Sequence, residues 1–108
     1  MSSIAIERHD AGHGVVRLAV TGQVGSSTSD LLAVTIRNAI FGGLVRLIVD
    51  LSRVAHFDFH GVDAVIAGRN LALEYGTDYR IVGGIHTDRF HGTGVQVHPG
   101  SGHRVTRC

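Results

Sequence analysis

Residues 44–76 read LVRLIVDLSRVAHFDFHGVDAVIAGRNLALEYG. Apolar residues run almost without a break over residues 44–51, which is typical of a strand that is paired in the middle of a sheet or covered on both faces. Over residues 61–75 apolar side chains recur at helical spacing, and Gly76 can end that helix in a left-handed conformation. The connecting residues 52–60 are predicted to be a loop.

The remaining pattern predicts an α/β fold with a mixed sheet. Further strands are predicted over residues 3–8, 15–22 and 78–84, and a further helix over residues 26–43. Ser27 and Asp30 resemble a capping box at the start of that helix. The first two strands are predicted to form a hairpin, and the order strand, strand, helix, strand, helix, strand implies two right-handed parallel crossovers.

Length and composition predict one folded domain that does not bind nucleic acid and does not insert into a membrane. The chain has 108 residues with a net charge of +1, and its ten basic residues are all arginines scattered without a cluster. Its one cysteine, Cys108, allows no internal disulfide, and no stretch approaches the ~18–20 apolar residues of a membrane span. We therefore expect a cytoplasmic protein with a core domain over residues 1–84 and an atypical glycine- and histidine-rich segment over residues 85–108.

The start of the second helix is the candidate functional site. Ligands and partners of such sheets meet the carboxyl ends of the strands, where residues 52–60 are expected. Asp58 is predicted to be the N-cap of the helix, accepting a backbone N–H. Phe59 either packs on its own loop or presents an apolar side chain to a partner.

Two histidine patterns leave a metal site open as an alternative. His56, Asp58 and His60 alternate, so on an extended strand they would share one side. The histidines of the C-terminal segment, with Asp88 and Cys108, could also gather around a metal, although their spacing fits no ligand rule; they are His86, His91, His98 and His103. No nucleophile or phosphate-loop motif is present, so no catalytic residue and no cofactor are predicted.

The run TGQV at residues 21–24, the capped helix after it, and residues 47–84 together resemble the STAS domain. This is the fold of bacterial anti-sigma factor antagonists and of the cytoplasmic tails of sulfate transporters. The most specific match is a strand ending in Asp50 and Leu51, followed by Asp58-x-x-Gly61 at the start of a helix. The resemblance implies a β-β-α-β-α-β sheet with helices packed on it and, in this sequence, C-terminal closing elements that are atypical or missing.

The resemblance also implies a site and shows where this chain departs from it. In the antagonist branch the helix opens with Asp-Ser-Ser-Gly or Asp-Ser-Thr-Gly, and the first serine is phosphorylated by a partner that is both kinase and anti-sigma factor. Asp58 and Gly61 match, whereas Phe59 occupies the phosphoacceptor position and His60 replaces the second hydroxyl. Phenylalanine has no hydroxyl, so this chain has no phosphoacceptor there. Gly25 stands where the family usually has an acidic residue.

The leading hypothesis is a non-enzymatic module that binds a kinase-type anti-sigma factor through Asp58, Phe59, His60 and Gly61. It would regulate sigma-factor-dependent transcription without a phosphorylation switch. Three alternatives stay open: a STAS scaffold or transport-associated subunit, a metal-dependent enzyme that uses His56, Asp58 and His60, and a degenerate copy that has lost its closing elements. In the last case an exposed sheet edge could pair two copies into a homodimer.

Overall fold

A β-hairpin opens the fold, as the alternating apolar residues predict. The structure is a computed structural model that describes residues 3–83, 90 and 96–98. Strand β1 spans Ile4–Gly12 and pairs antiparallel with β2, Val15–Val24. The connecting residues Gly12, His13 and Gly14 all have positive φ angles, of 82°, 58° and 78°. Two of the three are glycines, which adopt this conformation without steric cost, so the sequence GHG suits the turn.

Two helical crossovers then extend the sheet. Helix α1 (Ser29–Phe41) leads to strand β3 (Arg46–Phe57), and helix α2 (Phe59–Tyr75) leads to strand β4 (Asp78–Val82). β3 pairs parallel with β2, and β4 pairs parallel with β3. The order of strands is β1-β2-β3-β4-β5, where β5 is the short strand Gln96–His98, parallel to β4. The predicted α/β class, the hairpin and both parallel crossovers are therefore confirmed.

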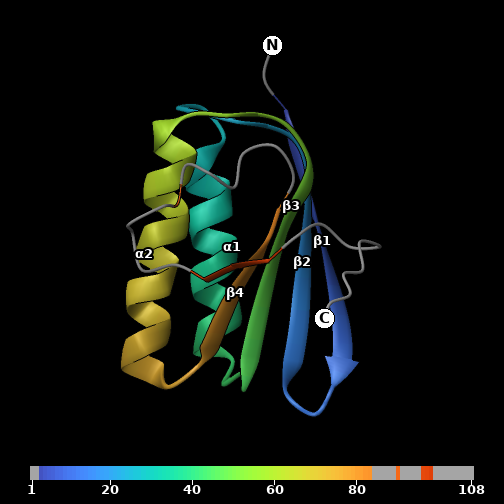
Figure 1. Cartoon of the computed structure of the whole chain (residues 1–108), viewed down its shortest axis with the longest axis vertical. Helices are drawn as coiled ribbons and strands as arrows, with labels where there is room; N and C mark the ends of the chain where they lie inside the picture. Colours follow the sequence, from blue (N-terminus) through green and yellow to red (C-terminus); the bar gives the residue numbers. More distant parts are fainter. Residues whose placement is uncertain (1–2, 84–89, 91–95, 99–108) are drawn as a thin grey trace, which may run out of the picture.

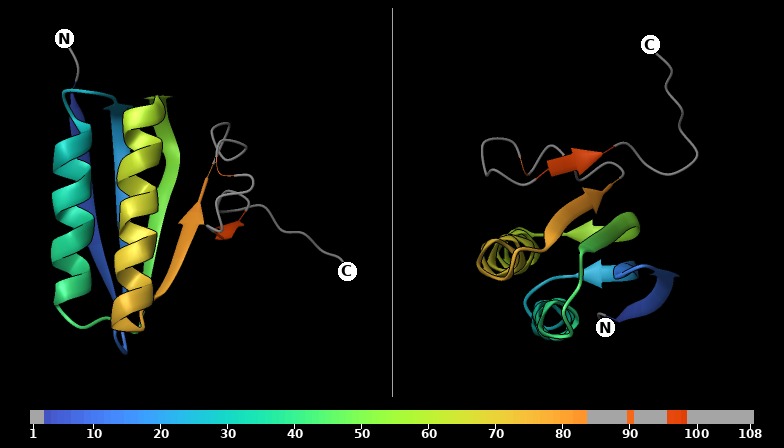
Figure 2. Two further views of the ribbon diagram at one scale, coloured as in Figure 1. Left: turned by 90° about the vertical axis from the view of Figure 1, so that its left-hand side faces the viewer. Right: turned by 90° about the horizontal axis from the view of Figure 1, so that it is seen from below.

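Both helices lie side by side on one face of the sheet (Figures 1 and 2). The core fills the space between this face and the helices; its fully buried members include Val16, Leu18, Val20, Leu32, Ile36, Ile40, Leu47, Val49, Val65 and Ile81. No helix of the described part of the chain lies over the opposite face (Figure 2). None of the helices described is long and apolar enough to cross a membrane.

Close packing joins α2 to α1 and to the sheet at Gly68. A Cβ atom added there would lie 2.6 Å from Ile36 Cγ2 and 2.7 Å from the Tyr79 hydroxyl oxygen. That hydroxyl donates a hydrogen bond of 2.9 Å to the Val65 carbonyl oxygen on the same helix. The absence of a side chain at Gly68 therefore lets α2 approach close enough for a buried tyrosine to bond its backbone.

Three local predictions are wrong. Residues 52–57 belong to β3 rather than to a loop, because they continue to pair with β2 as far as Val24 and Phe57. Helix α2 begins at Phe59, two residues before the predicted start. The capping box at Ser27 does not form: Thr28 is the N-cap residue of α1, and its side chain makes no capping bond because it folds back to Gln23 and Gly25.

Of the segment predicted to be atypical, the structure describes Phe90 and Gln96–His98. Phe90 is buried, and its ring lies 5.7 Å from that of Phe57. Gln96–His98 forms the three-residue strand β5 beside β4, and whether the closing elements are atypical stays a prediction. The boundary between the two predicted segments at residues 84 and 85 stays a prediction.

Candidate functional site

The candidate site lies where the carboxyl ends of β2 and β3 meet the starts of both helices, at the top of Figure 1. Val24 pairs with Phe57 at the last rung between the strands, and the Asp58 N–H donates to the Val24 carbonyl oxygen at 3.1 Å. Gly25 follows directly. A Cβ atom added to Gly25 would lie 3.2 Å from Asp58 Oδ2, so any side chain there would crowd the Asp58 carboxylate.

Asp58 is the N-cap of α2, as predicted. Its Oδ1 accepts the backbone N–H of His60 at 2.9 Å and that of Gly61 at 3.4 Å. Its Oδ2 lies 3.4 Å from His60 Nδ1. Desolvation of the carboxyl group raises its pKa, but the hydrogen bonds from the His60 side chain and from both backbone N–H groups outweigh this and lower the pKa below its usual value. The cap is therefore charged at neutral pH.

Gly61 rests directly on the strand ends. A Cβ atom added to Gly61 would lie 2.7 Å from Val24 Cγ1 and 2.8 Å from Phe57 Cε1. These distances are too short for any side chain, so only glycine allows the first turn of α2 to sit this low on the sheet. The glycine of the Asp-x-x-Gly motif thus has a packing role: it sets how closely the first turn of α2 approaches the ends of β2 and β3.

Phe59 projects into solvent, so its ring is not packed away in the fold. Its exposed fraction is 64%, and its ring stacks on the His60 imidazole with centroids 4.2 Å apart and ring planes 28° apart. The Asp58 carboxylate in turn lies beside that imidazole. Phe59 is thus an exposed aromatic side chain whose neighbour is held by the helix cap.

A hollow between the two helix starts was not predicted from the sequence. The turn before α1 is closed by Thr28 Oγ1, which accepts the Gly25 N–H at 2.9 Å and donates to the Gln23 carbonyl oxygen at 2.7 Å. This turn brings α1 beside α2. The resulting helix-start hollow has a volume of about 280 Å³ and is lined by Ser29, Asp30, Ala33, His60, Asp63 and Ala64. Its two aspartates make this part of the site acidic.

The structure does not bring His56, Asp58 and His60 together as a metal site would require. The strand ends at Phe57 and the helix begins at Phe59, so His56, Asp58 and His60 do not continue along one extended strand. Asp58 and His60 meet, but His56 does not join them. Within residues 3–83, 90 and 96–98, no three histidine, cysteine, aspartate or glutamate side chains are placed to hold a metal ion. His86, Asp88, His91, His103 and Cys108 lie outside the described residues.

Solved structures of anti-sigma factor antagonists are similar to this chain. One from Mycobacterium paratuberculosis has a TM-score of 0.76 and 25% identity, with 92% of this chain and 88% of that chain covered. SpoIIAA, an anti-sigma factor antagonist, in its unphosphorylated form has a TM-score of 0.74 and 16% identity, with 91% and 90% covered. The Bacillus cell fate determinant SpoIIAA in the phosphorylated form has a TM-score of 0.73 and 18% identity, with 91% and 93% covered.

No protein-family model matches the sequence, and no curated protein sequence does either. The structural likeness extends over more than nine tenths of the chain. The chain therefore has the STAS fold that its sequence predicts.

Proposed function

We propose that this chain is a non-enzymatic protein-binding STAS module that acts as an anti-sigma factor antagonist. In this proposal it binds a kinase-type anti-sigma factor in the bacterial cytoplasm and so frees a sigma factor for transcription. The shared fold and the 25% identity to an anti-sigma factor antagonist support this class of partner. The proposed contact surface consists of Asp58, Phe59 and His60, whereas Gly61 of the predicted site is buried against the strand ends and supports them from below.

One observation carries the proposal: Phe59 is 64% exposed at the first position of α2. Exposed aromatic side chains at the centre of a surface often anchor protein interfaces, because they bury a large apolar area on binding. The Phe59 ring stacks on the His60 imidazole, and that imidazole lies beside the Asp58 carboxylate. These contacts restrict the position of the Phe59 ring before a partner binds. Such preorganisation reduces the entropy cost of association.

The same residue makes binding independent of phosphorylation at this position. A phenyl ring offers no oxygen to a kinase, so no phosphate can be added to Phe59 to repel the partner. We therefore propose constitutive binding, in which the amount of this protein, rather than its phosphorylation state, determines how much anti-sigma factor is sequestered.

Calorimetric titration into each kinase-type anti-sigma factor of the same genome tests the proposal. ATP and magnesium are included, and intact mass is measured afterwards. Micromolar or tighter binding without added phosphate is expected. Binding to none of these factors would overturn the proposal, and binding to a membrane transporter instead would favour a transport-associated subunit.

A matched pair of variants locates the contact. Phe59→Ala is expected to weaken binding at least tenfold, as loss of an interface anchor does. Leu73→Ala is the control, because Leu73 lies on the same helix, is 65% exposed and stands far along α2 from the helix start. Equal affinity of wild type and Phe59→Ala would show that the partner binds elsewhere.

A further inference from the structure

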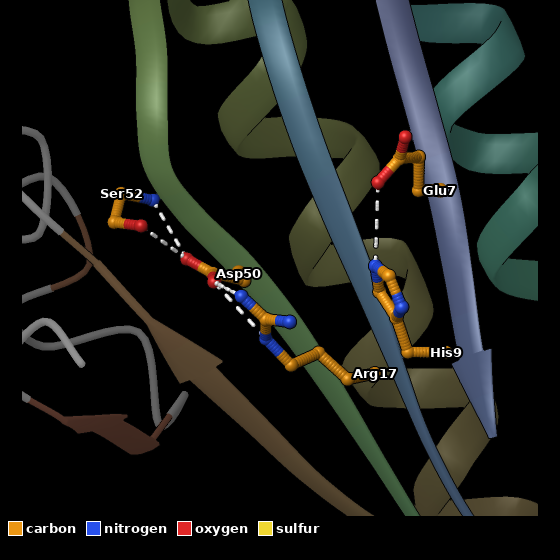
Figure 3. Close-up of polar contacts among 5 residues, drawn as sticks. All are labelled: Glu7, His9, Arg17, Asp50 and Ser52. Atoms are coloured by element: carbon orange, nitrogen blue, oxygen red, sulfur yellow. Dashed lines mark hydrogen bonds and ion pairs between the residues drawn. The ribbon is translucent and has the colours of Figure 1, made fainter. Parts of the chain in front are cut away.

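A second hollow lies on the face of the sheet that the helices leave uncovered, where Figure 3 shows the side chains of Glu7, His9, Arg17 and Asp50. It has a volume of about 230 Å³ and spans β1, β2 and β3; its side chains are Glu7, His9, Arg17, Ala19, Asp50 and Arg53. Ala19 is its floor, because it pairs with Glu7 on one side and with Asp50 on the other. The small side chain of Ala19 between larger neighbours leaves the space that forms this sheet-face hollow.

A bulge in β3 places both Asp50 and Arg53 at the hollow. These residues are three positions apart, so on a regular strand their side chains would point to opposite faces. Their partners on β2 are Ala19 and Thr21, which are two positions apart, and the register shifts between these pairs. The extra residue in β3 therefore turns Arg53 to the same face as Asp50, as bulges commonly re-aim a side chain.

The Asp50 carboxylate has its acceptor positions filled. Oδ1 accepts the Ser52 backbone N–H at 2.9 Å and the Ser52 hydroxyl at 2.6 Å. Oδ2 accepts Arg17 Nε–H at 3.1 Å and also a hydrogen bond from Arg17 Nη2 (Figure 3). Its side chain is only 4% exposed. Four donors match the roughly four lone-pair positions of a carboxylate, so Asp50 is poorly suited to bind a cation and instead holds Arg17 in place.

The guanidinium groups leave donors available. Arg17 has five N–H donors, of which two bind Asp50, and its side chain is 41% exposed. For the other three, and for the exposed Arg53, the described part of the chain provides no hydrogen-bond or ion-pair partner. Two arginines with spare donors at one hollow form the arrangement that recognises carboxylate and phosphate oxygens.

Glu7 on the rim opposes an anion, but its side chain is exposed to solvent. Its Oε1 lies 3.3 Å from His9 Nε2, and both side chains are at least half exposed. The exposed Glu7 carboxylate is screened by water and salt. The charged groups that face the hollow are thus Arg17 and Arg53 against Glu7 and the fully hydrogen-bonded Asp50.

We propose that the sheet-face hollow binds a small doubly charged oxyanion between Arg17 and Arg53, with Asp50 as the positioning residue for Arg17. The volume of about 230 Å³ is below the roughly 300–1,000 Å³ of sites for drug-sized ligands, so it suits a phosphate or a short dicarboxylate rather than a whole nucleotide. This site lies on the opposite face of the sheet from the helices, so it does not depend on the proposed contact at Phe59.

Nuclear magnetic resonance titration of the full chain tests the site. Inorganic phosphate, malonate and sodium chloride are added separately at matched ionic strength, and the Nε–H signals of Arg17 and Arg53 and the Ala19 amide are followed. We expect saturable shifts of all three with phosphate or malonate and none with chloride. Saturable shifts with phosphate but not malonate would indicate that the ligand carries a phosphate group. Saturable shifts with malonate but not phosphate would indicate a ligand with two carboxylates. Shifts that do not saturate, or that chloride reproduces, would overturn the proposal.

Substitutions distinguish binding of an anion in the hollow from a general effect of the net charge of the protein. Arg53→Gln and Ala19→Leu are expected to weaken anion binding at least tenfold, the first by removing donors and the second by filling the hollow. Arg69→Gln is the control, because it removes the same charge from helix α2, on the other face of the sheet. Glu7→Gln is expected to tighten binding, which a purely structural role would not do. Equal weakening by Arg69→Gln and Arg53→Gln, with Ala19→Leu folded and unaffected, would refute the site.

Discussion

Asp58 and His60 are joined twice, because Oδ1 of Asp58 accepts the backbone N–H of His60 at 2.9 Å while Oδ2 lies 3.4 Å from its Nδ1. The aspartate that starts helix α2 therefore also restrains the imidazole on which Phe59 stacks. Stability of the helix start and orientation of the exposed ring depend on one carboxylate. These two roles can be separated by substitution.

Asp58→Ala is expected to lower the melting temperature and to weaken partner binding, since it removes both the cap and the contact with His60. Asp58→Asn is the matched variant: asparagine caps about as well as aspartate, but it has no charge to offer the imidazole. We expect Asp58→Asn to melt close to wild type and to bind less tightly. Thermal unfolding followed by circular dichroism, with calorimetric titration, measures both. Equal melting temperatures of wild type and Asp58→Ala would contradict the capping role.

Asp50 is expected to contribute to the acid sensitivity of the fold. Desolvation raises its pKa, but hydrogen bonds from Ser52 and Arg17 and the charge of Arg17 lower it below the usual 3.8. A carboxyl group whose pKa is lower in the folded chain stabilises the fold above its unfolded pKa, and this stabilisation is lost as pH falls through the folded pKa. The free energy of unfolding should therefore decline below about pH 5.

Urea unfolding between pH 7 and pH 3 checks this behaviour. Asp50→Asn should show a flatter dependence of the unfolding free energy on pH, and Ser52→Ala should lie between it and wild type. Asp50→Ala should also lose about 1–3 kcal/mol at pH 7, because Arg17 and the Ser52 N–H would lose their buried partner. An identical pH dependence in wild type and Asp50→Asn would rule out this contribution.

Gly68→Ala is expected to destabilise the protein although alanine favours helices. The new Cβ atom would lie 2.6 Å from Ile36 Cγ2 and 2.7 Å from the Tyr79 hydroxyl. Overpacking costs about 1–3 kcal/mol, whereas the gain in helix propensity is roughly 0.8–1 kcal/mol. Leu73→Ala on the same helix is the exposed control. Urea midpoints that are unchanged or higher for Gly68→Ala would show that α2 can shift without cost.

Tyr79 is expected to ionise only when the protein unfolds. Burial raises the pKa of its hydroxyl far above the usual 10.0, and that hydroxyl donates to the Val65 carbonyl oxygen. A group that stays protonated in the fold stabilises it below its unfolded pKa, and this stabilisation is lost as pH rises above about 10. Phenolate absorbance and circular dichroism recorded together test this, with Tyr79→Phe as the control. Ionisation of Tyr79 before any loss of helical signal would disprove it.

Features with a local cause were predictable from the sequence. The turn at Gly12 and Gly14, the left-handed end of α2 at Gly76 and the Asp58 cap each depend on the conformational preference or hydrogen bonding of one or two residues. The apolar run over residues 44–51 likewise predicted a central strand, and β3 pairs with β2 along one edge and with β4 along the other.

Features with a distant cause were missed. β3 continues to Phe57 because β2 supplies its partners, while polar residues such as Arg53 and His56 hide the strand pattern. The bulge that turns Arg53 toward Asp50 is likewise a property of the pairing between two strands. The exposure of Phe59 depends on how the start of α2 packs on the rest of the fold, and no local sequence pattern shows that packing.

The order of strands in the sheet is the order of strands in the chain. Each strand after the first pairs with the one synthesised just before it, so none has to be inserted between two that are already joined. A chain that leaves the ribosome from its N-terminus can therefore add one strand at a time to an existing template. At every stage the growing edge of the nascent sheet, opposite β1, is covered by the next strand, which shortens the time in which another chain could pair with that edge.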